Sequence, residues 1–162
     1  MSTTTTNNAG EFAGFPVDQL RLVNCTPHTV VLLTEELSED TWEMMTVPYA
    51  VPPSGTVARV EMTRTQEFLL AIAEEAAIPV NVTATGSVTG LPEQRPGRYI
   101  IVSRQVAEAL PGRGDLLIVD DTVRDEDGRI IGARALASLA TPEAREAFRR
   151  LSLGDGRFPF YD

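Results

Sequence analysis

The chain of 162 residues contains no lysine, so all 14 of its basic side chains are arginines. This absence excludes chemistry that needs an ε-amino group, such as Schiff-base catalysis, attachment of pyridoxal phosphate and the lysine of a P-loop. A single cysteine, Cys25, excludes a disulfide within the chain, and with one histidine, His28, no zinc site built from these residue types can be completed. We therefore predict no cofactor and no metal, and an enzyme is the least favoured class.

Basic clusters are also missing, because 23 acidic residues outweigh the arginines and give a net charge of −9. Nucleic acids and anionic membranes attract clustered basic side chains, so neither is an expected partner. The longest apolar runs, such as residues 99–102, are far shorter than the roughly 20 residues of a membrane-spanning helix. The first residues have neither a basic start nor an apolar stretch, so we expect no signal peptide and a cytoplasmic location.

The chain divides by composition into three parts. Residues 1–19 are poor in apolar side chains and predict a flexible N-terminal arm. Residues 20–154 are rich in short apolar runs and predict a single β-rich domain. Residues 155–162 form an aromatic C-terminal tail, which we expect to dock on this domain.

Short alternating or β-branched runs predict strands at residues 20–24, 29–34, 41–49, 56–62, 80–84, 98–102, 116–119 and 129–136, with a hairpin turn at 125–128. A capping-box pattern at Thr63 and Gln66, followed by apolar residues at helical spacing, predicts a helix over 65–77. Ser103 and Thr141 are placed as N-caps of two more helices, the second with Ala144, Phe148 and Leu151 as its buried stripe. The predicted fold class is α+β and β-rich: a small antiparallel or mixed sheet or barrel with two or three short helices.

Five segments carry a resemblance to other proteins: Asn24-Cys25-Thr26-Pro27-His28, Pro53-Ser54-Gly55-Thr56-Val57-Ala58-Arg59, Gly90-Leu91-Pro92, Tyr99-Ile100-Ile101-Val102-Ser103 and Gly128-Arg129-Ile130-Ile131-Gly132. In this order the chain resembles a group of small uncharacterised phage, prophage and actinobacterial proteins that begin near an Asn-x-Thr-Pro-His motif. The resemblance covers roughly residues 20–136, without the acidic segment 35–40 and the segment 65–77. It implies a phage-type setting and assigns no catalytic residue.

The favoured candidate site for a small anion comprises residues at predicted strand ends and turns: Arg59, Arg113, Arg129, Arg134, Ser54, Gly55 and His28. Guanidinium groups bind phosphate or carboxylate in a bidentate manner, and a Ser-Gly turn adds hydroxyl and backbone N–H donors. The alternative is that the arginines lie apart on the surface.

Three further patterns have simpler structural explanations. Cys25 and His28 are three residues apart but fit a turn, and Ser103 lacks the glycines of a hydrolase elbow and fits a helix cap. The acidic cluster around the predicted hairpin turn fits a solvated tip, because its glycine comes too early for a calcium-binding loop: Asp120, Asp121, Asp125, Glu126 and Asp127.

Two classes of function are favoured over the third, an enzyme of unknown class. The first is a non-enzymatic phage-type accessory protein that captures a small anionic ligand or a host protein. The second is a structural or assembly subunit of a virion or other complex, favoured by the N-terminal arm and the aromatic tail and compatible with a homo-oligomer.

The charge balance generates the first testable prediction. Micromolar full-length protein should not shift DNA or RNA in a gel at low salt, because −9 charges repel phosphates. Tight binding that weakens as salt is raised would contradict it.

Overall fold

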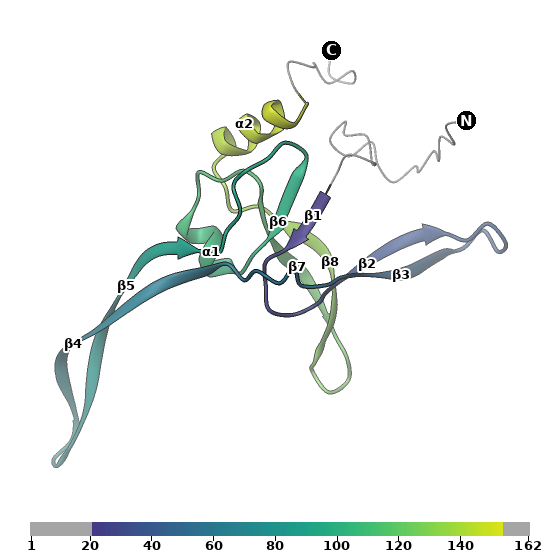
Figure 1. Cartoon of the computed structure of the whole chain (residues 1–162). Coiled ribbons are helices and arrows are strands. Elements are labelled where there is room, and N and C mark those ends of the chain that lie inside the picture. Colours follow the sequence, from purple (N-terminus) through teal and green to yellow (C-terminus); the bar gives the residue numbers. More distant parts are fainter. Residues whose placement is uncertain (1–20, 154–162) are drawn as a thin grey trace.

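The structure is a computed structural model, and it describes residues 21–153 (Figure 1). The predicted N-terminal arm, the end of the last helix at Gly154 and the aromatic tail lie outside these residues. The elements in chain order are β1 (Arg21–Asn24), β2 (Val30–Leu37), β3 (Met44–Val51), β4 (Arg59–Ala73), β5 (Ala76–Thr89), β6 (Arg98–Ile101), α1 (Arg104–Ala109), β7 (Leu116–Arg124), β8 (Ile130–Ala137) and α2 (Pro142–Leu153). Neither helix of this part of the chain has the length and apolar character to cross a membrane.

Six strands form one mixed sheet in the order β1-β6-β7-β8-β2-β3, and β4 and β5 form a separate two-stranded ribbon. Neighbours β1–β6, β6–β7 and β8–β2 are parallel, whereas β7–β8 and β2–β3 are antiparallel. The β-rich class with a mixed sheet is therefore confirmed, and residues 21–153 contain two short helices.

Three hairpins project from a small body in different directions (Figure 1). The β4–β5 ribbon extends to the lower left, the β2–β3 hairpin to the right and the β7–β8 hairpin downward, while both helices stay with the body. The core lies where the hairpins meet the body. Its buried side chains come from β6, α1 and β7, joined by Cys25 and Ala58.

Helix α2 packs against β6, the strand of the body that is buried. Residues Ile100 and Ile101 of β6 are fully buried, as an uninterrupted apolar run predicts. Phe148 of α2 is buried against Tyr99, with ring centroids 5.0 Å apart and an edge-to-face angle of 76°. Gly114 lies directly against Ala144 and Phe148, so a side chain at this position would collide with the α2 backbone.

The local sequence signals at the caps and turns are confirmed. Ser103 accepts a hydrogen bond from the Val106 N–H at the start of α1, and Thr141 accepts one from the Ala144 N–H at the start of α2. Gly128 closes the β7–β8 turn with a φ of 79°, a conformation that glycine adopts without strain. In α2, however, Leu151 is 48% exposed, so the predicted buried stripe is wrong at this residue.

The predicted helix over 65–77 is wrong, because this segment forms the end of β4, a turn and the start of β5. The helical spacing of Phe68 and Ile72 would stabilise a helix only if one face packed on a core, and these side chains are 48% and 64% exposed. The following residues 80–89 are rich in Val and Thr, which favour strands, and they pair with β4 along its length. Non-local pairing therefore overrides the helical propensity of the leucine, alanine and glutamate residues here.

Asn24, at the end of β1, is buried and uses its whole side-chain amide in hydrogen bonds. Its Nδ2 donates to the carbonyl of His28 (2.8 Å) and to that of Val51 at the end of β3 (3.0 Å). Its Oδ1 accepts from the backbone N–H (2.9 Å) and the hydroxyl (2.6 Å) of Thr26. Its carbonyl accepts from the Ser54 N–H, so this one residue joins β1 to the turn at His28 and to the segment after β3.

Replacing the amide of Asn24 tests this arrangement. In Asn24→Asp the NH2 group of Nδ2 is replaced by one carboxylate oxygen that faces the carbonyls of His28 and Val51, so we expect the free energy of unfolding at pH 7 to fall by roughly 2–5 kcal/mol. Urea unfolding measures it. The matched control is Gln105→Glu, the same exchange at an exposed position of α1, which should change stability by less than about 0.5 kcal/mol. Equal effects of the two substitutions would contradict a structural role for Asn24.

Candidate functional site

The four arginines of the predicted anion site lie in different parts of the fold. Arg59 is exposed at the start of β4, and Arg129 is exposed in the turn between β7 and β8. Arg134 of β8 lies 4.0 Å from Asp121, and both side chains are more than half exposed. Arg113 lies in the turn before β7 and is half-buried.

Arg113 already has an anionic partner within its own chain. Its Nε and Nη2 donate to the two carboxylate oxygens of Asp115 at 2.8 and 2.7 Å, and Nη2 also donates to the carbonyl of Pro92 at 3.0 Å. Asp115 is fully buried, so this bidentate contact neutralises a charge that has no access to water. The pair thus fixes the turn before β7 to the loop before β6.

Ser54 and His28 each form a hydrogen bond with Asn24 through their backbones, and Gly55 follows Ser54 in the chain. The Ser54 hydroxyl donates to the Thr56 carbonyl (3.2 Å) and lies 3.7 Å from the Cys25 sulfur. Gly55 has a φ of 94°, which suits the turn that follows β3. The carbonyl of His28 accepts the hydrogen bond from Asn24, and its side chain is exposed.

A cavity of about 420 Å³ lies between the start of β2 and the β7–β8 hairpin. It is lined mainly by apolar residues, and His28, Thr29 and Thr122 contribute polar side chains. The other lining residues are Val30, Val31, Val119, Ile130, Ile131, Gly132 and Ala133. Of the residues predicted to bind an anion, His28 lines this cavity, whereas the four arginines do not. A shared anion pocket therefore stays a prediction.

The acidic cluster of the β7–β8 hairpin shapes its turn. Oδ1 of Asp125 accepts from the backbone N–H groups of Asp127 (3.0 Å) and Arg129 (2.9 Å). Within residues 21–153, no group of three or more His, Cys, Asp or Glu side chains is arranged to hold a metal ion.

Exposed apolar side chains mark a second candidate site, and the sequence analysis missed it. Of 16 exposed large hydrophobic residues, 15 lie on the three hairpins and the other is Leu151. We call residues 30–51, 59–89 and 116–137 the three arms. Their exposed apolar residues are Leu37, Trp42, Met44, Met45 and Tyr49; Met62, Phe68, Leu69, Leu70, Ile72, Ile78 and Val82; and Val119, Ile130 and Ile131. Clustering of this kind indicates an interaction surface.

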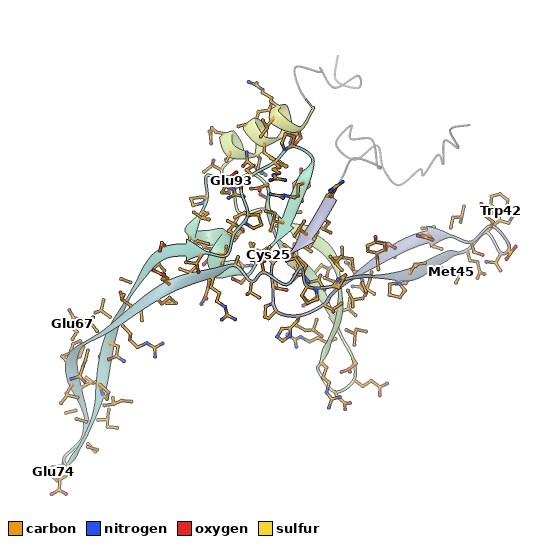
Figure 2. All side chains as sticks on the ribbon, in the orientation of Figure 1. Cys25, Trp42, Met45, Glu67, Glu74 and Glu93 are labelled. Atoms are coloured by element: carbon orange, nitrogen blue, oxygen red, sulfur yellow. The ribbon has the colours of Figure 1, made fainter. Side chains whose placement is uncertain are left out.

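The tip of the β2–β3 arm concentrates this exposure. Trp42 is 77% exposed and has a φ of 56°, a left-handed conformation that is unfavourable for a residue with a bulky side chain. Figure 2 shows Trp42 at the end of the arm and Met45 a short way along it, both far from the body. A strained backbone that presents an aromatic residue to solvent is typical of binding positions.

Charge is divided between the arms and the body. The arms contain 14 acidic residues and five arginines, and the β2–β3 arm has five acidic residues and no arginine. The rest of residues 21–153 has eight arginines and five acidic residues. The arms are thus negative and the body is positive.

Comparison with known proteins found no matching family model, no match among curated proteins and no match among solved structures.

The burial of Asp115 generates a prediction that separates structure from ligand binding. Arg113→Gln leaves a buried carboxylate without its cation, so we expect a loss of about 3–5 kcal/mol in urea unfolding. Arg129→Gln, the same substitution in the exposed turn, should cost less than about 0.5 kcal/mol. If Arg113→Gln kept full stability and abolished binding of inorganic phosphate, the anion site would be supported instead.

Proposed function

We propose that the chain is a structural subunit of a protein assembly, and that its three arms bind neighbouring subunits. The observation that carries this proposal is the concentration of exposed large hydrophobic residues on the arms. The resemblance to phage and prophage proteins makes a virion one such assembly.

The energetics of the arms support this proposal. Each half-exposed side chain such as Leu70 forgoes on the order of 1 kcal/mol that burial would provide. The β4–β5 arm is a two-stranded ribbon, and such a ribbon needs further strands or a packed face to be stable in water. Contact with a neighbouring subunit would provide the additional strands, the packed face or both.

The division of charge supports contacts between the arms and the body. A β2–β3 arm without arginine would be repelled by the acidic arms of a neighbour and attracted by its arginine-rich body. Such contacts also use the apolar side chains at the arm tip, so charge directs the approach and apolar burial holds the contact.

Capture of a small anion by the arginines is the other reading of the sequence. Arg113 is neutralised by Asp115 and Arg134 lies near Asp121, which leaves less positive charge for a ligand. We therefore place anion capture second. Its test is whether a phosphorylated ligand raises the melting temperature of the protein.

Self-association of the full-length protein tests the proposed function. Sedimentation velocity over a range of micromolar concentrations should give masses above that of one chain. Leu70→Ser on the β4–β5 arm should raise the half-dissociation concentration about tenfold or more, which corresponds to about 1.4 kcal/mol.

The matched control is Leu151→Ser on α2. Leu70 and Leu151 are 49% and 48% exposed, so the two substitutions remove the same side chain at equal exposure. The control should leave the mass distribution unchanged. A chain that stays monomeric throughout, or an equal effect of the two substitutions, would contradict assembly through the arms.

A further inference from the structure

The β5 strand has an edge without charge. In the described part of the chain its neighbour is β4 on one side, and its other side is free. Its 14 residues include no Asp, Glu or Arg, whereas β4 carries Arg59, Glu61, Arg64 and Glu67. Natural proteins block free strand edges with charges or with proline, so β4 is protected by its charges, whereas β5 has no charge and has Pro79, which lacks one backbone N–H.

The open part of this edge is its regular part. At the root of the arm the ladder is irregular between Val60 and Met62, which face Val88 and Thr85. From Thr85 to Ala76 every β5 residue has a partner on β4. Two register shifts occur here, between Gln66 and Phe68 and between Ala71 and Ala73, and both place the extra residue on β4, so β5 itself is continuous. Its even-numbered side chains from Ile78 to Ala84 are apolar, and its odd-numbered ones are proline, asparagine and threonine.

We propose that β5 pairs with β5 of a second copy of this chain, antiparallel about a two-fold axis, to form a four-stranded sheet β4-β5-β5-β4. This rests on the proposed function and names the contact through which two subunits meet. The pairing gives partners to the free backbone groups of both edges, except at Pro79, which has no N–H to donate, and it gives each ribbon the additional strands that it needs.

Charge selects a second copy as the partner. Binding a different protein specifically requires a feature that rejects self-pairing, such as like charges along the edge, and β5 has no charge; Pro79 removes a single backbone donor. The β3 edge of the six-stranded sheet is also uncharged, but it belongs to the arm with five acidic residues, which repel those of a second copy. The β4–β5 arm carries four acidic residues and two arginines, a net charge of −2 against −5 for the β2–β3 arm, so two copies repel each other less at β5 than at β3.

The alternation of side chains fixes the register. A residue must oppose one from the same face, so that the apolar sides of both ribbons lie on one side of the new sheet. With the segment from residue 76 to 85 overlapping in all but one terminal residue, the axis passes through Val80 or Asn81. The two copies of that residue then face each other with Cα atoms about 4.5–5.5 Å apart.

Cysteine cross-linking of the full-length protein tests this geometry. Asn81→Cys and Val80→Cys place a thiol at each possible axis, and facing residues satisfy the Cα distance of a disulfide. The controls are Gln66→Cys and Phe68→Cys on β4, which pair with Asn81 and Val80 within one ribbon. In the proposed sheet the two β4 strands are three strand spacings apart, about 14 Å, which is too far for a disulfide. The native Cys25 is 1% exposed, and the unsubstituted chain serves as the background.

We expect oxidised glutathione to convert one of the β5 variants mainly to a dimer on a non-reducing gel, at least tenfold faster than its β4 control. Equal rates for β4 and β5 variants would overturn the proposal. An oligomer by sedimentation without a β5 cross-link would overturn the β5 contact and leave the proposed function standing. A monomer by sedimentation without any cross-link would overturn the proposed function as well.

Discussion

The fold depends on the buried amide of Asn24. Its hydrogen bonds reach the turn at His28 and the end of β3, and the next residue, Cys25, donates to Ile101 of β6 and accepts from Ala58 just before β4. The roots of two arms and the central strand of the body are therefore held by two consecutive residues. These backbone and amide hydrogen bonds fix where the arms begin, so a small apolar core is enough to hold the body together without apolar contacts along the arms.

This arrangement separates folding from interaction. The buried side chains belong mainly to β6, α1, β7 and α2, and the arms beyond their roots contribute few of them. Side chains on the arms are thus free to serve contacts with other molecules without affecting the core. Their charge follows the same division, with an acidic β2–β3 arm, an uncharged β5 edge and a basic body.

The sequence predicted the elements whose signals are local. The buried strand at 98–102, the cap at Ser103 and the turn at 125–128 depend on neighbouring residues, and the structure has all three. The helix predicted over 65–77 is wrong because residues 65–73 pair with residues 76–82 across the hairpin, and a helical pattern does not take pairing between strands into account. For this arm, the alternation in residues 56–62 and 80–84 was the available signal. The exposure of the apolar side chains on the arms could not be predicted, because an apolar run has the same pattern whether or not it packs against a core.

The junction between β8 and β2 has a mechanical consequence. These strands are registered through one pair, Leu32 with Ala133, and Gly132 leaves room there for the side chain of Leu33. Tension applied along the β2–β3 arm therefore meets little resistance from the sheet. At the end of β3 the arm is also held by the hydrogen bond from the Asn24 amide to the Val51 carbonyl, so this bond takes up part of any load that the sheet does not carry.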